Sequence, residues 1–179
     1  MTLKIPETLL ALESNCGVFA LWMLFQHHGI DKNINELIDI SGHDSEEGTF
    51  TITLVVALQK LGFDVTFYTD VDPNVDPREV IYYEKCNILG ISIESALSYQ
   101  QLQDAVNDGK FVIVYYDTLD GVGNQSLVYS IDNDEICFFD SFDPMSKVIF
   151  EQQRKVDGIC RQAIVIDDLS FDLYSTQLN

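Results

Sequence analysis

The chain is poor in basic residues and in histidine. It has 10 lysines and arginines against 29 aspartates and glutamates, a formal charge of −19, and only three histidines among 179 residues. A surface with this charge repels phosphate backbones, so we expect no binding to nucleic acid. The charge is compatible with a solvated acidic surface, with a salty habitat or with a basic partner.

Cysteine is scarce as well. The four cysteines are Cys16, Cys86, Cys137 and Cys160. None belongs to a CxxC pair, and no histidine is spaced to complete a zinc site, so the sequence predicts no metal and no cofactor. The last three lie in or beside apolar runs, which is typical of small core residues in a reducing compartment.

The sequence shows neither the pattern of a signal peptide nor an apolar segment long enough to cross a membrane. Residues 1–6 lack the apolar stretch of a signal peptide, and the apolar run 18–25 is too short to cross a bilayer. We therefore expect no membrane span. The expected location is the cytoplasm, with export by a route that needs no cleaved signal as the alternative.

Helical patterns dominate the first half of the chain and strand patterns the second. The predicted helices cover 16–28, 34–40, 51–61 and 98–106, and the predicted strands cover 63–68, 111–116, 125–131, 135–139, 147–150 and 162–166. The pattern of 78–85 is ambiguous and favours a helix, and 88–93 is a strand or an extended segment. This order predicts an α+β fold in which an N-terminal helical lobe packs on a C-terminal antiparallel β-sheet.

Cys16 stands where a loop becomes a buried helix. Backbone N–H groups in the first helical turn are unpaired, and the helix dipole favours a thiolate there, so this position suits a nucleophile. The alternative is an inert core cysteine. If Cys16 is the nucleophile, an alkylating reagent should label it faster than the other three cysteines.

Four segments in order resemble one enzyme family. They are Asn15-Cys16-Gly17 heading an apolar helix to His28-Gly29, the loop 48–50 before a helix to Leu61-Gly62, the run 109–114, and the strand 123–129 leading to Asp140. This order resembles the peptidase C39 group of papain-like cysteine peptidases, from about Leu10 to Ile166. The resemblance implies a papain-like fold, one domain over residues 1–168 and a tail over 169–179.

The resemblance also implies a catalytic triad, and this chain departs from it. In that family a cysteine attacks a carbonyl, a histidine takes its proton and an aspartate orients the imidazole. The matching positions are Cys16, Asn124 and Asp140. An asparagine amide neither takes nor gives a proton near neutral pH. A glutamine that donates to the oxyanion in the family is also missing, since Leu10 falls near its place.

Another histidine could in principle replace the missing base. His27 and His28 lie at the far end of the predicted helix, roughly 16 Å from the sulfur along the helix axis. His43 lies in the loop before Gly48, which could fold toward the cleft. Its alternative role is that of an exposed loop residue.

Three explanations fit the missing histidine: a natural pseudoenzyme, an engineered replacement of histidine by Asn124, or a different alignment with different chemistry. Two functions follow. In one, the Cys16/Asn124/Asp140 cleft recognises a peptide or protein, with hydrolysis weak or lost. In the other, Cys16 is the nucleophile of an active thiol hydrolase or acyltransferase acting on a peptide, isopeptide or amide bond. The resembled family typically cleaves double-glycine leader peptides.

Overall fold

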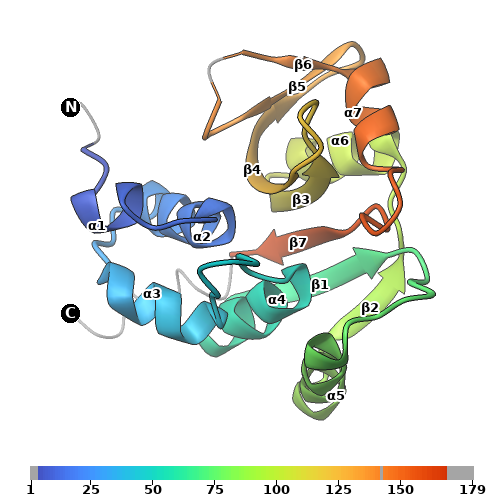
Figure 1. Ribbon diagram of the computed structural model, residues 1–179. Helices are drawn as coiled ribbons and strands as arrows, with labels where there is room; N and C mark the ends of the chain where they lie inside the picture. Colours follow the sequence, from blue (N-terminus) through green and yellow to red (C-terminus); the bar gives the residue numbers. More distant parts are fainter. Residues whose placement is uncertain (1–3, 142, 169–179) are drawn as a thin grey trace.

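The computed structural model describes residues 4–141 and 143–168, and Figure 1 shows its elements. The helices are α1 (Glu7–Leu10), α2 (Cys16–His27), α3 (Ile34–Ser41), α4 (Thr51–Lys60), α5 (Pro77–Leu89), α6 (Tyr99–Asn107) and α7 (Lys147–Gln153). The strands are β1 (Asp64–Thr69), β2 (Ser92–Ser95), β3 (Phe111–Asp117), β4 (Gly123–Ile131), β5 (Glu135–Phe138), β6 (Met145–Ser146) and β7 (Ala163–Asp167).

The strands form one sheet in the order β2-β1-β7-β3-β4-β5-β6. The predicted α+β class, with a helical N-terminal lobe on a C-terminal sheet, is confirmed. Every strand pair is antiparallel except β1 with β2, which run parallel because α5 forms a crossover between them. The sheet is therefore antiparallel over most of its width and parallel at one edge.

Both faces of the sheet are covered, and the strand sequences alternate accordingly. In β7, Ile164 and Ile166 join the core formed with α2 and α4, whereas Ala163 and Val165 join the core under α6 and α7. In β3, Ile113 faces the first core and its neighbours Val112 and Val114 face the second. Successive side chains of a strand point to opposite faces, so two apolar layers need a nearly continuous apolar strand.

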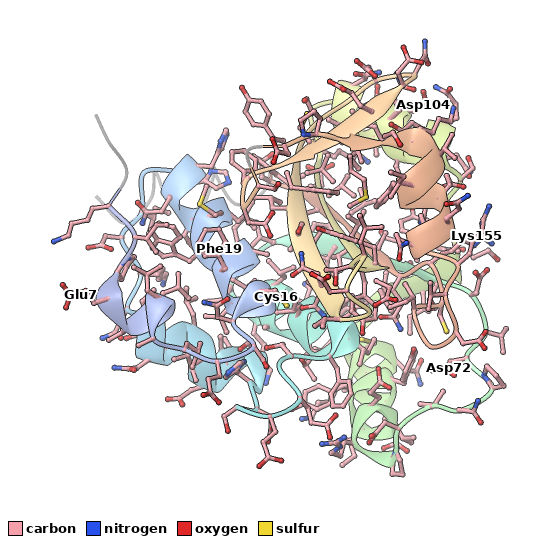
Figure 2. All side chains as sticks on the ribbon, turned by 45° about the horizontal axis from the view of Figure 1, so that its top comes forward. Glu7, Cys16, Phe19, Asp72, Asp104 and Lys155 are labelled. Carbon is pink, nitrogen blue, oxygen red and sulfur yellow. The ribbon has the colours of Figure 1, made fainter. Side chains whose placement is uncertain are left out.

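Helix α2 is the central element of the helical lobe. Most of its residues are buried, and it packs against β4 of the sheet. The helix begins at Cys16, as predicted, and Gly29 follows its end with a positive φ of 69°. Figure 2 shows Cys16 where the helical segments meet the strands. The buried helix thus fixes the cysteine against β4.

The predicted capping box at Ser98 is confirmed. The Ser98 hydroxyl accepts a hydrogen bond from the Gln101 backbone N–H, and the Gln101 side chain accepts one from the Ser98 N–H. Ser98→Ala should lower the free energy of unfolding by about 1 kcal/mol, because it leaves a helix N–H without its partner. Urea denaturation measures this loss. Ser95→Ala, a change on an exposed strand residue, is the control, and an equal loss in both variants would contradict the role of the cap.

Two predicted strands are wrong in part or whole. Residues 147–150 belong to helix α7, where the Ser146 hydroxyl accepts from the Ile149 N–H and Phe150 is buried while Val148 is exposed. The polar residues that follow continue the helical pattern, which a lysine and three apolar residues alone cannot reveal. Residues 88 and 89 end helix α5, and strand β2 starts only at Ser92, after Gly90 with a φ of 71°.

The predicted tail over 169–179 lies outside the described residues, and the boundary of the single domain at 168 stays a prediction. Within residues 4–141 and 143–168, no helix has both the length and the apolar character needed to cross a bilayer.

Candidate active site

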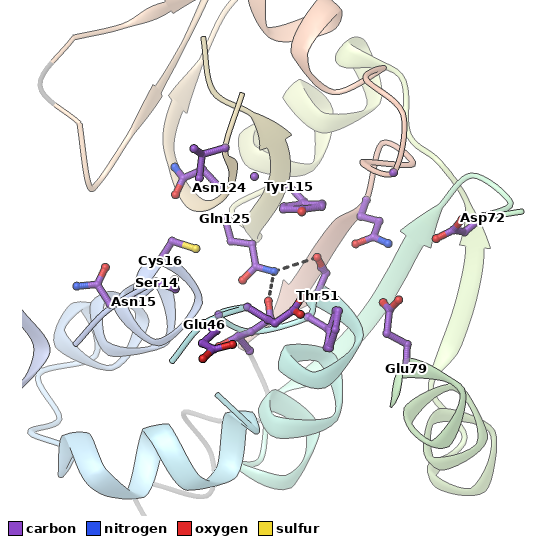
Figure 3. A pocket seen from close by; sticks show the side chains of 18 residues that line it. Ser14, Asn15, Cys16, Glu46, Thr51, Asp72, Glu79, Tyr115, Asn124 and Gln125 are labelled. Carbon is purple, nitrogen blue, oxygen red and sulfur yellow. Dashed lines mark hydrogen bonds between the residues drawn. The ribbon is translucent and has the colours of Figure 1, made fainter. Parts of the chain in front are cut away.

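Cys16 occupies the first position of α2, after a loop that is anchored to α1. The Asn15 side-chain amide donates to the Leu9 carbonyl at 2.7 Å, so it ties the loop to α1 and gives no side-chain cap to the helix. Figure 3 shows the Cys16 sulfur directed toward β4, while the Asn15 side chain points away from it. The cysteine therefore faces the sheet from a fixed helix end.

Gly17 lets α2 approach the sheet and the loop before α4. A Cβ atom at this position would lie 2.5 Å from Gln125 Oε1 and 2.9 Å from Thr49 Cβ. Gln125 is itself held, because its Nε2 donates to the Thr49 carbonyl at 2.7 Å and to the Thr51 hydroxyl at 3.1 Å. The Cys-Gly pair is thus explained by packing: only glycine fits between these groups.

Asn124 lies on β4 at the same cavity as Cys16 and is held from behind. Its Nδ2 donates to the Tyr116 hydroxyl at 2.9 Å and to the Ser126 hydroxyl at 3.0 Å. Both N–H donors of the amide are therefore engaged. Figure 3 shows the amide oxygen on the side that faces Cys16. The group presented toward the sulfur is a hydrogen-bond acceptor that takes up no proton.

Asp140 lies behind Asn124 and does not line the cavity. The Ser126 hydroxyl donates to Asp140 Oδ2 at 2.8 Å, and Ser126 in turn accepts from Asn124. Although Asp140 keeps an exposed surface, desolvation of its carboxyl group raises its pKa above the ordinary value, against the lowering effect of the bond from Ser126. The structure thus brings Cys16 and Asn124 to one cavity, and Asp140 lies behind them, in contact with both Ser126 and the Asn124 side chain.

The Cys16 thiol is not activated by these surroundings. Desolvation raises the pKa of Cys16, and the Asp140 carboxylate raises it further. Backbone N–H groups of Gln125, Gly17 and Cys16 lower it without cancelling the rise. The expected thiolate at the helix N-terminus is therefore wrong for neutral pH, because burial outweighs the helix contribution.

This electrostatic arrangement predicts a pH-dependent reactivity. Since the pKa of Cys16 is raised, its alkylation by iodoacetamide should accelerate as pH increases through and beyond the ordinary thiol range. Asp140→Asn removes a negative charge, so the pKa of Cys16 should fall and labelling at pH 8 should be faster. Peptide mapping by mass spectrometry follows Cys16 separately, with Asp134→Asn as an exposed control. Unchanged or slower labelling in Asp140→Asn would contradict the view that the charge of Asp140 raises the pKa of Cys16.

The relative reactivity of the four cysteines stays a prediction. Cys86 is fully buried and its pKa is raised to about 11, and burial also raises the pKa of Cys160. Cys16 is only half-buried. Access to the reagent, and not thiolate character, is now the reason to expect faster labelling of Cys16 than of Cys86.

No histidine replaces the missing base among the residues that line this cavity. His43 instead approaches the Thr49 hydroxyl with Nδ1 at 3.2 Å, and burial lowers its pKa. His27 and His28 lie at the other end of α2, where both rings contact Phe111. Leu10, near the expected place of the oxyanion donor, is exposed and does not line the cavity either. Backbone N–H groups are the donors that remain beside the sulfur.

The cavity beside Cys16 has a volume of about 460 Å³ and is strongly acidic. Its carboxylates are Glu46, Glu47, Asp72 and Glu79, and no lysine or arginine lines it among the described residues. No group of three metal-ligating side chains occurs in the described part of the chain. The arrangement suits a ligand with polar N–H groups or positive charge.

Sequence reasoning missed Ser126 and Tyr116, which hold Asn124. Ser126 lies two residues after Asn124 and so shares its face of β4, a signal that was present in the strand pattern. Tyr116 pairs with Asn124 across β3 and β4, and this register is known only from the structure. Gln125 points to the opposite side from Asn124, as the strand alternation predicts.

Comparisons with known proteins bear on the family and the fold of the chain. A model of the Peptidase C39 family matches residues 6–80, which include Cys16 and the loop before α4. A similar solved structure is the peptidase domain of Streptococcus ComA, a bi-functional ABC transporter involved in a quorum-sensing pathway. The two share a TM-score of 0.53 and 20% identity over 86% of this chain and 90% of that one, a similarity of fold. A comparison with curated protein sequences gave no match.

Proposed function

We propose that this chain, which is a C39-like peptidase-fold protein, recognises a peptide or protein segment in the cavity of Cys16 and Asn124 and hydrolyses it weakly or not at all. The observation that carries the proposal is the hydrogen bonding of the Asn124 side chain. Both of its N–H donors are engaged by Tyr116 and Ser126, so the acceptor oxygen is what remains for the cleft. The site keeps groups that bind a peptide and lacks the group that removes a proton.

The chemistry of acyl transfer supports weak turnover. The thiol proton of Cys16 must leave before or during attack on a carbonyl, and a positioned base usually accelerates such a step by about 10²–10⁴-fold. The amide of Asn124 cannot take this proton, and the raised pKa of Cys16 leaves little thiolate at neutral pH. Binding of a peptide in the cavity needs no proton transfer and no thiolate.

The alternative is an active thiol hydrolase or acyltransferase with Cys16 as nucleophile. One observation favours it: backbone N–H groups of Gly17 and Gln125 lie close enough to the sulfur to lower the pKa of the thiol. In such a reaction the sulfur would form a thioester with the acyl group, the amine would leave with the thiol proton, and water would hydrolyse the thioester. This function requires a base from outside the described cavity.

Affinity selection tests the proposal. The immobilised chain is incubated with a randomised peptide pool, and the retained peptides are identified by mass spectrometry. Cys16→Trp, whose ring should fill the cavity, is the matched control, with circular dichroism to verify folding. We expect a defined set of peptides to be retained by the native chain and lost with the variant. Retention of the same set by both chains, or of none by the native chain, would overturn the proposal.

A further inference from the structure

The cavity beside Cys16 continues into a second cavity. The second has a volume of about 590 Å³ and shares Asp72, Glu79 and Gly158 with the first. Figure 3 shows Asp72 and Glu79 on the far side of the cavity from Cys16, with Tyr115 and Gln125 between them. We name the region of Asp72, Glu79, Gly158 and Gln162 the distal groove. The distal groove is therefore continuous with the cavity that Cys16 lines.

Two polar side chains of the distal groove are mostly buried and have few hydrogen-bond partners. Glu79 is only 8% exposed, and its carboxylate has a single hydrogen bond at 3.3 Å, from the Asp76 N–H to Oε2. Gln162 is only 4% exposed and lines the first cavity, and its side-chain amide makes no hydrogen bond in the described part of the chain. Both side chains line the first cavity, so their acceptor oxygens are available to a donor from a ligand there.

Nearby positive charges are engaged elsewhere. Arg78 binds Asp76 through Nη2 at 2.7 Å, pairs with Glu47 at 3.4 Å and stacks on Phe50, so it is engaged by residues that line the cavities and does not itself line them. Arg161 binds Asp70 through two hydrogen bonds. In the second cavity, Arg154 and Lys155 both pair with Glu151. The carboxylates of Asp72 and Glu79 have no ion pair within the described residues, and the groove keeps its negative charge.

We propose that the distal groove binds a lysine or arginine side chain of the peptide that occupies the Cys16 cavity. The carboxylates of Glu79 and Asp72 would accept its N–H groups, and the side-chain oxygen of Gln162 would accept another. Charge-assisted hydrogen bonds of this kind are stronger than neutral ones, and more so where water is partly excluded. The inference rests on the proposed function, which supplies the bound peptide. The preference for a positively charged side chain rests on the carboxylates of the distal groove.

A pair of small probes tests the charge preference directly. N-acetyl-arginine amide is titrated into the ¹⁵N-labelled chain, and amide shifts are followed by NMR. N-acetyl-citrulline amide has nearly the same shape without the charge. We expect the arginine probe to shift Asp72, Glu79, Gly158 and Gln162, and the citrulline probe to bind about tenfold more weakly, as for a lost charge-assisted hydrogen bond.

Glu79→Gln should also lower the affinity for the arginine probe by about tenfold, since glutamine keeps the acceptor of the helix cap but removes the charge. Glu84→Gln, an exposed change on the same helix α5, is the matched control and should leave binding unchanged. Equal binding of both probes, or equal loss in both variants, would overturn the inference. So would a failure of the arginine probe to shift the groove.

The two proposals fail separately. If the affinity selection retains peptides without basic residues while the arginine probe does not bind, the distal groove inference is wrong and peptide recognition stands. If the arginine probe binds the groove but no peptide is retained, peptide recognition is wrong and the cation site stands.

Discussion

An Asn124→His variant is expected to cleave acyl substrates about 10²-fold faster than the native chain, the lower end of the usual gain from a general base. The imidazole would take the place of the amide, donate one N–H toward the Ser126 and Tyr116 hydroxyls, and present its other nitrogen to Cys16. The lower end is expected because a side-chain oxyanion donor is also missing near Leu10. Release of p-nitrophenol from p-nitrophenyl acetate, and cleavage of peptides from the affinity selection, measure the gain.

Three controls make this experiment specific. Asn124→Gln keeps an amide and should give no gain. Asn124→His with Cys16→Ser should lose the gain, because the nucleophile is absent. Asp140→Asn in the Asn124→His background should reduce the gain and flatten its pH profile, since Asp140 positions the imidazole through Ser126. A folded Asn124→His variant with unchanged rates would contradict the view that the missing base limits this site.

Gly17→Ala is expected to lower the free energy of unfolding by about 1–3 kcal/mol, although alanine is normally the better helix residue. The added methyl group would lie 2.5 Å from Gln125 Oε1 and 2.9 Å from Thr49 Cβ, and neither group can retreat freely because Gln125 is bonded to the Thr49 carbonyl. The loop before α4 would have to move away from α2. Urea denaturation measures the loss.

The double variant Gly17→Ala with Gln125→Ala tests the cause. Removing the Gln125 side chain gives space for the methyl group. The double variant should therefore lose less unfolding free energy than the two single variants together, with a coupling of about 1 kcal/mol. Additive losses, or a Gly17→Ala variant as stable as the native chain, would contradict the packing role of Gly17. The same shift should also weaken peptide retention, because Thr49 lines the cavity.

The sequence predicts well those features that depend on local patterns. The start of α2 at Cys16, the cap at Ser98 and the strand β3 follow from apolar spacing and from short-range hydrogen bonding, and the structure confirms them. The strand predicted over 147–150 is wrong because a run of three apolar residues fits a strand and a helix equally well. Burial of Phe150 against the second core decides the outcome, and this contact is not local.

The candidate site is predicted in part. Cys16 and Asn124 were named from the sequence and line one cavity, but their roles stay predictions. The thiol pKa was expected to be low from the helix end, and burial with the Asp140 charge raises it instead. These effects depend on which strands and loops surround the sulfur. Glu79 and Gln162 lie far apart in the chain, and only the packing of α5 beside the sheet brings them to one groove.

The most direct test of peptide recognition is a crystal structure of the native chain with a peptide retained in the affinity selection. We predict an uncut peptide in the groove, with a backbone carbonyl beside the Cys16 sulfur, a donor bonded to the Asn124 amide oxygen and a basic side chain at Glu79. A peptide on another face of the molecule, or a severed peptide held as a thioester on Cys16, would contradict the account.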